Sequence, residues 1–313
     1  MITNRKMFET VDAFAIPQKT LSFARLIRPE NILPTTLLCY AGGYIVNPNI
    51  LSVLKTPRFY VSTLTTLLVM SNSMILNDLY DINLDKIDHP TRPIVSGEIK
   101  IKEAIGAAVV FMTVSEFLSM RFLSPISQIA VHVANTLILL YTPVLKRIPF
   151  IKNIACSSLI SFSPYFIGIS IQNFYKQQNI GLLTVLLRMI FFGSLIIEMF
   201  LDIVDIEGDR KNGIYTLPVI FGRDFTFQFA NNIALFNVLS NMLHLTVLYD
   251  FKTAVVFLFL QSPLINSMKQ VKQAQYEKTA IKKYANQLIY PLSTSLLYLC
   301  FLAGFRQPLV LRW

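Results

Sequence analysis

Charged residues are scarce in this sequence: only 15% of its 313 positions are charged, whereas 53% are hydrophobic. Glycine and proline are also few, with 11 and 15 residues and no biased tract, which leaves little room for a disordered linker or a fibrous segment. A soluble domain normally carries more charge. The composition therefore predicts an integral membrane protein that forms a single domain over residues 1–313.

Cysteine and histidine are too few and too scattered to predict a disulfide framework or a zinc site. The three cysteines lie in apolar stretches without a C-x-x-C neighbour, and we interpret them as core residues. The three histidines show no ligand spacing. The first 20 residues lack the apolar segment of a cleavable signal and contain Glu9 and Asp12, so we expect no secretory signal.

Long apolar runs, in contrast, are abundant. A helix needs about 20 mostly apolar residues to cross a bilayer, and the sequence contains nine candidate segments, of which the eighth falls short of that length. They predict an all-helical membrane protein. The segments are residues 31–47, 59–76, 104–120, 126–145, 153–172, 181–201, 227–249, 253–266 and 287–305.

The distribution of basic residues supports this number of spans. With nine spans, one side of the membrane holds the N-terminus and the loops after the second, fourth, sixth and eighth spans, and that side carries most of the 28 Lys and Arg residues. Because basic residues favour the cytoplasmic side, the N-terminal segment 1–24 is predicted to face the cytoplasm, or the matrix or stroma of an organelle. The net charge of +10 then reflects contact with anionic lipid rather than with nucleic acid.

Acidic residues, although rare, concentrate in two windows on that same side. The first acidic window, residues 78–88, follows the second span, and the second acidic window, residues 202–209, follows the sixth. Residues three and four apart share a helix face, so a trio in each window is predicted to form one acidic stripe, with Asp88 outside the first trio. The two trios are Asp78, Asp81 and Asp85, and Asp202, Asp205 and Asp209.

The second trio repeats the spacing of the first, beginning at position 202 instead of 78. Further along, the pentapeptide PIVSG at 93–97 is similar to PVIFG at 218–222. This pattern resembles an internal repeat of four helices. Repeats in membrane proteins often frame a ligand site at their interface, so both stripes are expected at equivalent depths.

Paired carboxylate stripes are typical of sites for hard cations such as Mg²⁺, which complete their shell with phosphate oxygens. We therefore predict Mg²⁺ ions that bridge a diphosphate, with an apolar cavity behind them for a hydrocarbon tail. Such a polyprenyl diphosphate would ionise to an allylic carbocation, which an acceptor or an internal double bond would trap. Candidate basic residues for the diphosphate are Arg92, Lys146, Arg147, Lys152, Arg210 and Lys211.

The same stretches resemble the motifs of the UbiA superfamily of intramembrane prenyltransferases. NDLYDINLD, from Asn77, is similar to its first Asp-rich motif, and DIVDIEGDRKNGIYTLPV, from Asp202, is similar to its second. HPTRPIVSG, YTPVLKR and RPENIL match further blocks, so the resemblance runs from about residue 28 to 222. It implies a bundle of about nine transmembrane helices around a central cavity. The wording of the second motif is closest to the branches that use homogentisate, chlorophyllide or a glyceryl phosphate as acceptor.

The resemblance also implies roles for individual residues, with no obligatory protein partner. All six trio aspartates would serve the Mg²⁺-diphosphate site, and the second motif leaves open whether Asp202 or Asp205 is its leading ligand. The implied substrate-binding residues are Asn77 beside the metal ions, Arg92, Lys146 and Arg210 on the diphosphate, Tyr141 near the reacting carbon, and Asn31 and Asn153 in the pocket.

Two alternatives differ from prenyl transfer to an acceptor. A membrane terpene cyclase would use the same site, and a cation-coupled transporter would use the acidic stripes for translocation. Transporters place ionisable residues near the bilayer midplane, whereas these stripes fall at helix ends, which argues against transport. Inside the spans, Glu198 precedes Asp202 by four residues and would extend its acidic face. Glu116, His132 and His244 fit an interhelical contact or acceptor binding equally well.

Overall fold

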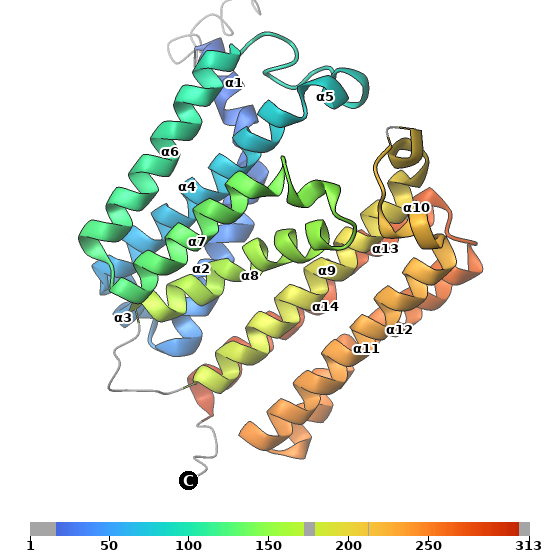
Figure 1. Ribbon diagram of the computed structural model, residues 1–313. Coiled ribbons are helices and arrows are strands. Elements are labelled where there is room, and N and C mark those ends of the chain that lie inside the picture. Colours follow the sequence, from blue (N-terminus) through green and yellow to red (C-terminus); the bar gives the residue numbers. More distant parts are fainter. Residues whose placement is uncertain (1–16, 172–178, 212, 307–313) are drawn as a thin grey trace, which may run out of the picture.

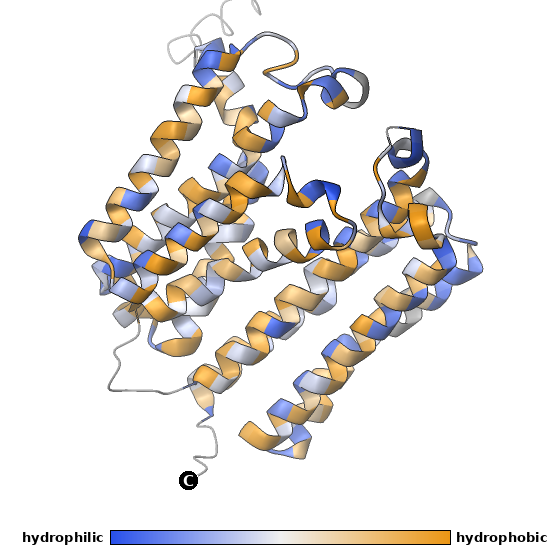
Figure 2. Ribbon diagram, in the orientation of Figure 1, coloured by the Kyte–Doolittle hydropathy of each residue, from blue (hydrophilic) through white to orange (hydrophobic). Residues whose placement is uncertain are grey.

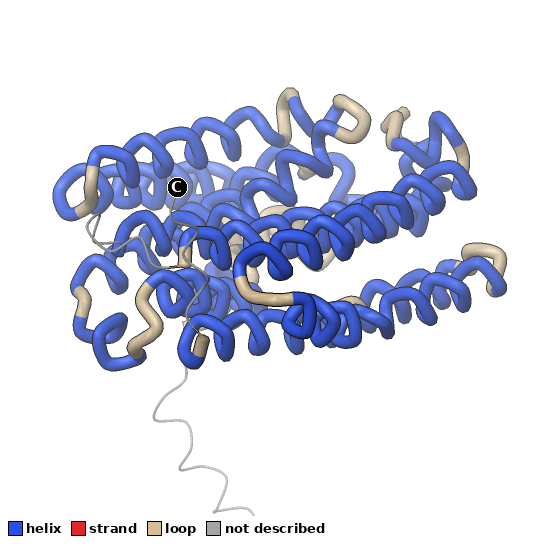
Figure 3. The backbone as a smooth tube through the Cα atoms, turned by 90° about the horizontal axis from the view of Figure 1, so that it is seen from below, coloured by secondary structure: helices blue, strands red, loops and turns tan. Residues whose placement is uncertain are grey.

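The computed structural model describes residues 17–171, 179–211 and 213–306, and in these ranges the regular structure is helical (Figures 1 and 3). The predicted all-helical fold is confirmed. The helices are α1 (Gln18–Leu26), α2 (Ile32–Val46), α3 (Ile50–Lys55), α4 (Pro57–Tyr80), α5 (Ile82–Asp88), α6 (Ile101–Phe122), α7 (Pro125–Tyr141), α8 (Ile151–Ile171), α9 (Ile180–Lys211), α10 (Leu217–Phe221), α11 (Arg223–Leu248), α12 (Phe251–Gln273), α13 (Lys278–Gln287) and α14 (Ile289–Phe305).

Every predicted span coincides with a helix: α2, α4, α6, α7, α8, α9, α11, α12 and α14. By length and apolar composition, six segments of the described chain are able to cross a membrane, and α7 is a shorter apolar helix. The uncertain eighth span is longer than expected, because α12 continues to Gln273 before α13 begins. Of the predicted N-terminal segment, residues 1–16 lie outside the described residues, and α1 follows.

Hydrophobic residues predominate along the long helices, and hydrophilic residues gather around several of the helix ends (Figure 2). On α6, for example, Val109, Phe117 and Met120 are exposed. Water would penalise such a surface, whereas lipid acyl chains accommodate it. The arrangement fits the membrane assignment made from composition.

Helices α2 and α8, which form two walls of the cavity described below, pack closely against each other. A Cβ atom at Gly42 would lie 2.6 Å from the Cα atom of Pro164, so only glycine permits this approach of the two backbones. Pro164 lies inside α8, where it removes a backbone hydrogen bond and disfavours straight helix geometry. A substitution at Gly42 would therefore displace α8 from α2.

One pair of helix contacts in each half corresponds in the way that a four-helix repeat predicts. α4 packs against α6 in the first half, and α9 packs against α11 in the second. In the two similar pentapeptides, Gly97 and Gly222 both adopt a positive φ, +80° and +86°, a conformation that favours glycine. The duplication itself stays a prediction, but the two halves agree in backbone conformation at these glycines.

Candidate active site

Both acidic windows lie at the same end of the bundle. Figure 1 shows α5, the connection between α7 and α8, and α10 at that end. The segment that runs from this connection into the start of α8 contacts both windows. Lys146 donates to Asp81 in the first window, and Lys152 donates to Asp202 in the second, with an Nζ–Oδ1 distance of 2.6 Å. One short segment of basic residues therefore holds the two windows within reach of one another.

The first acidic window does not form the single helical stripe that its spacing predicted. α4 ends at Tyr80, Asp81 joins it to α5, and α5 begins at Ile82. Asp and Asn side chains compete for nearby backbone groups, and α5 is short with few buried residues to hold it in line with α4. Asp78 and Asp85 still approach each other, whereas the Asp81 carboxylate contacts Lys146.

Two arginines neutralise the buried carboxylates of this window. Arg92 bridges Asp78 and Asp85, with an Nη1–Oδ1 distance of 3.2 Å to Asp78. Arg28 donates to the same Asp78 oxygen at 2.8 Å. Burial raises the pKa of the Asp85 carboxyl, and the hydrogen bond from Arg92 opposes this shift. The two guanidinium groups thus compensate carboxylates that burial alone would tend to protonate.

Sequence reasoning did not single out Arg28. It lies between α1 and a short 3₁₀ helix, Pro29–Asn31, and its φ of +54° is unusual for a residue with a side chain. This conformation is compatible with its ion pair to Asp78. The signal was the RPENIL block, in which Arg28 comes first.

The second acidic window lies on an unbroken helix, as its spacing predicted. Asp202 is buried and accepts hydrogen bonds from Lys152 and from Asn153, whose Nδ2 atom is 3.0 Å from Oδ2. Asp209 accepts a hydrogen bond from the Thr216 hydroxyl at 3.1 Å. Asp205 and Arg210 lie on the exposed side of α9. Asn153 therefore orients the buried aspartate of this window.

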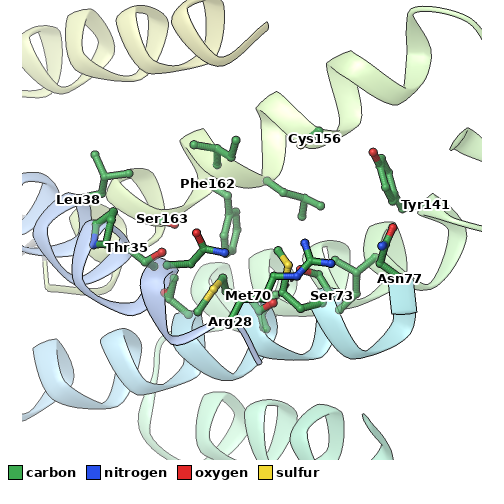
Figure 4. Close-up of a pocket in the computed structure, with 18 of the residues that line it drawn as sticks. Arg28, Thr35, Leu38, Met70, Ser73, Asn77, Tyr141, Cys156, Phe162 and Ser163 are labelled. Atoms are coloured by element: carbon green, nitrogen blue, oxygen red, sulfur yellow. Dashed lines mark hydrogen bonds between the residues drawn. The ribbon is translucent and has the colours of Figure 1, made fainter. Parts of the chain in front are cut away.

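A cavity of about 470 Å³ opens beside the windows, between α2, α4, α7, α8 and α9. Three predicted substrate-binding residues line it: Asn31, Asn77 and Tyr141. Figure 4 shows Asn77 and Tyr141 at one end of the cavity, with Leu38 and Thr35 at the other. Arg28 and Glu198 also line the cavity. Further lining residues are mostly apolar: Pro34, Val69, Met70, Met74, Ile138, Leu159, Ile160 and Phe162.

Four other ionisable residues inside the spans, Glu116, His132, Arg188 and His244, lie outside this cavity lining. Glu116 accepts a hydrogen bond from the Asn135 Nδ2 atom at 2.8 Å, and its Oε1 atom lies 3.5 Å from the His132 Nδ1 atom. On the other half of the molecule, Arg188 contacts Asn241 and His244, each at 2.8 Å. Both groups link neighbouring helices, which favours the interhelical interpretation over acceptor binding.

The carboxylates of the two windows are of the ligand type that Mg²⁺ prefers, but they do not form a complete metal site by themselves. All the acidic side chains of the two windows offer oxygen, the ligand type that Mg²⁺ prefers. Within the described residues, no three Asp, Glu, His or Cys side chains lie close enough to hold a metal by themselves. Mg²⁺ commonly takes one or two carboxylates and completes its shell with water and phosphate oxygens. The windows therefore fit ions that bind together with a diphosphate.

Comparison with known proteins places these motifs in a family. A model of the UbiA prenyltransferase family matches residues 32–290. A digeranylgeranylglyceryl phosphate synthase of Sulfolobus acidocaldarius is 30% identical over 215 residues, which cover 68% of this chain and 74% of that protein. A synthase of the same name from Methanosphaera stadtmanae is 28% identical over 241 residues, covering 76% and 82%.

Solved structures share the fold. One, described as giving insights into digeranylgeranylglyceryl phosphate synthase in membranes, superimposes with a TM-score of 0.72 at 21% identity and covers 92% of this chain and 99% of that one. A UbiA homologue from Archaeoglobus fulgidus bound to GPP and Mg²⁺ gives a TM-score of 0.60 at 19% identity, covering 90% and 99%. At these identities the likeness concerns the fold.

Proposed function

Because this chain belongs to the UbiA prenyltransferase family, we propose that it transfers a polyprenyl group from a prenyl diphosphate to the hydroxyl of a glyceryl phosphate lipid, with Mg²⁺ as cofactor. Membership in the family makes the chain a membrane-embedded prenyltransferase. The acceptor, the metal and the roles of individual residues go beyond that membership. They rest on the site and on its relatives.

One observation carries the proposal: a largely apolar cavity is lined by Arg28, which pairs with Asp78 of the first acidic window, and by Asn77 beside that aspartate, and we call this part of the cavity its mouth. At about 470 Å³, the cavity falls in the size range of small-molecule sites, roughly 300–1,000 Å³. Its apolar walls suit a hydrocarbon chain, while Arg28 and Asn77 at the mouth suit a polar head group. A ligand with a diphosphate at one end and a prenyl chain at the other satisfies both requirements.

The six trio aspartates are the residues that would hold Mg²⁺. Bound ions would neutralise the diphosphate and so make it a better leaving group. The chain itself supplies four cations beside these aspartates, Arg28, Arg92, Lys146 and Lys152, which can stabilise the charge that develops as the diphosphate departs. Arg210 would contact the substrate from the exposed side of α9.

The walls of the cavity protect the allylic carbocation. Apolar side chains exclude water, which would otherwise trap the cation as an alcohol. The aromatic ring of Tyr141 lines the cavity beside Asn77, where a ring face can stabilise positive charge. Asn31 lines the same cavity, and Asn153 acts indirectly by orienting Asp202.

The names of the relatives support a glyceryl phosphate acceptor. Several of them are named digeranylgeranylglyceryl phosphate synthase, a name that describes a glyceryl phosphate carrying two geranylgeranyl groups. A glyceryl phosphate lipid that carries one prenyl ether and one free hydroxyl is the corresponding acceptor. The excess of basic residues on one side supports a site that faces the cytoplasm, matrix or stroma.

The test uses the purified full chain in lipid nanodiscs with labelled geranylgeranyl diphosphate and Mg²⁺. The acceptors are a geranylgeranylglyceryl phosphate, homogentisate and no acceptor. We expect a labelled diether with the first. Product formed without any acceptor would identify a cyclase, and a quinol product would replace the lipid acceptor by an aromatic one.

Variants then test the metal site. Asp81→Ala and Asp205→Ala should each abolish Mg²⁺-dependent diphosphate release while the protein remains inserted in the membrane. Glu277→Ala, at an exposed acid between α12 and α13, is the matched control and should retain wild-type turnover. Normal turnover in either aspartate variant would contradict the assignment of these residues.

A further inference from the structure

Glu198 lies between the acidic windows and the apolar cavity. It is on α9, four residues before Asp202, so both side chains share one face of an unbroken helix. Four residues advance a helix by about 6 Å. Asp202 is in the second acidic window, whereas Glu198 lines the cavity itself, together with Tyr141 and Asn77. The Glu198 carboxylate is thus one helical turn further toward the interior than the aspartates.

The surroundings of Glu198 differ from those of the buried aspartates. Asp78, Asp85 and Asp202 each form an ion pair with Arg or Lys. Within the described residues, by contrast, no basic side chain lies within ion-pair distance of Glu198. Its hydrogen-bond partner there is the Cys156 thiol, whose sulfur is 3.3 Å from Oε1. A thiol is a weak donor, so the carboxylate keeps capacity to accept another hydrogen.

A structural role explains Glu198 poorly. An acid inside a membrane protein is costly unless it is paired or has a function. Glu116 illustrates the first case, since it accepts a strong hydrogen bond from Asn135 and lies outside the cavity lining. Glu198 has a weaker partner and faces the space where a substrate would lie.

The proposed reaction requires a proton acceptor at this place. When the allylic C–O bond to the diphosphate breaks, the electron pair leaves with the diphosphate. A lone pair of the acceptor hydroxyl then forms the new C–O bond, and the hydroxyl proton must leave. The diphosphate is held by cations at the mouth, so a base closer to the reacting carbon serves the acceptor better.

We propose that Glu198 is the general base of the transfer: its carboxylate accepts the hydrogen bond of the acceptor hydroxyl in the cavity and takes the proton as the ether bond forms. The inference rests on the proposed function, because it needs an alcohol acceptor. It also predicts a preference for hydroxyl acceptors, since a carboxylate whose only described hydrogen-bond partner is a weak thiol donor disfavours acceptors that have no hydrogen to donate. The proton is later released to water when product leaves.

The primary test is Glu198→Gln, which keeps the shape and the bond from Cys156 but cannot take a proton. We expect the rate of diether formation to fall at least about a hundredfold, the lower range for loss of a general base. The affinity for labelled geranylgeranyl diphosphate, measured with Mg²⁺ and no acceptor, should change less than about threefold. Glu116→Gln is the matched control, an intramembrane acid outside the cavity lining, and should keep wild-type rates.

A second variant keeps the inference testable if Glu198→Gln is impaired in folding. Glu198→Ala removes the side chain beside the cavity, and added formate, a small carboxylate, should restore part of the lost rate. The control anion is chloride at the same ionic strength. Rescue by formate and not by chloride supports proton transfer, which a purely structural role of Glu198 would not produce.

Three outcomes would overturn the inference. These are a wild-type transfer rate in Glu198→Gln, a fall in prenyl diphosphate affinity as large as the fall in rate, and failure of formate to rescue Glu198→Ala. Failure of the proposed function has a different signature, in which the wild-type chain itself forms no diether. The two failures are therefore separated by the wild-type measurement.

Discussion

The first acidic window is built on a broken helix and the second on a continuous one, although the two share their spacing. In the first, α4 ends before Asp81, and the apolar residues Leu79 and Ile82 are only partly buried. In the second, Ile203, Val204 and Ile206 are buried in the core, and this packing keeps α9 helical to Lys211. The same pattern of carboxylates therefore gives different backbones, because the apolar residues between them are more deeply buried in the second window than in the first.

The partners of the carboxylates differ in the same way. Two forked guanidinium groups serve the first window, whereas one ammonium and one amide serve the buried aspartate of the second. Arginine can bridge two carboxylates, and lysine acts as a point charge. We infer that the first window depends on bridging by Arg92, and that the second depends on the rigidity of α9.

The largest effects are expected from Asp78→Asn and Asp202→Asn. Each should lower kcat/KM at least about a hundredfold, the range for loss of a preorganised electrostatic group. Stability should separate them, because Lys152 is the most buried of the cations, with 15% of its side chain exposed against 29% for Arg28. Asp202→Asn should therefore lower the unfolding temperature in detergent more than Asp78→Asn. A larger fall in unfolding temperature for Asp78→Asn than for Asp202→Asn would contradict the proposed difference between the two windows.

Arg92→Lys should have the next largest effect, on substrate binding. The ammonium group cannot bridge Asp78 and Asp85 as the guanidinium does, so we expect KM for the prenyl diphosphate to rise about tenfold. Arg121→Lys is the control, because Arg121 lies in the last turn of α6, and we expect it to leave KM unchanged. An unchanged KM in Arg92→Lys would mean that charge alone, without bridging, is sufficient in the first window.

Much of this arrangement followed from the sequence. Apolar runs located all nine predicted helices, since length and hydropathy determine which segments can cross a bilayer. The motifs located Asn31, Asn77 and Tyr141, which line the cavity. The cations of the mouth could be predicted only in part, and Arg28 was missed because a loop residue with positive φ belongs to no periodic pattern.

The break at Asp81 could not be predicted, because periodicity alone does not reveal which neighbours will be buried. The spacing predicted one continuous helix for each window, and tertiary packing determined that only the second window is continuous. Exposure of Arg210 is a second example, since its position beside Asp209 says nothing about the face of α9 on which it lies. The structure leaves its proposed contact with the diphosphate as a prediction.

The glycines of the two pentapeptides test whether the halves are equivalent despite these differences. A Cβ atom at Gly97 or Gly222 would meet nothing within 4 Å, so the cost of alanine there is that of the positive φ alone. Gly222 has φ +86° and ψ 166°, a region nearly restricted to glycine, and we expect both substitutions to destabilise by about 1–3 kcal/mol. Gly106→Ala, in the interior of α6, should instead stabilise by about 0.5–1 kcal/mol. Unequal losses at the two glycines, measured by unfolding in detergent, would contradict their equivalence.

The smallest effect should come from Glu98, which follows the first window in the sequence. Its contacts with Ser22 and Arg25 link α1 to the segment that carries Arg92. Hydrogen bonding from Ser22 and the charge of Arg25 lower the pKa of Glu98 below its usual 4.5. The link is therefore present above that pH and is lost as the pH falls through the lowered value. Relative to Glu98→Gln, the wild-type chain should gain a constant margin of unfolding temperature between pH 6 and 8, and this margin should shrink below pH 4.5.

In the second window, the exposed contact between Arg223 and Glu207 at 3.5 Å offers a comparison. Glu207→Gln is therefore the matched control, and exposed pairs of this kind contribute little to stability. If its margin of unfolding temperature equalled that of Glu98→Gln, α1 would not be held by Glu98 in particular. In that case the position of Arg28, which follows α1, would depend on its ion pair with Asp78, on the contact between Lys19 and Glu103, and on the burial of Leu26.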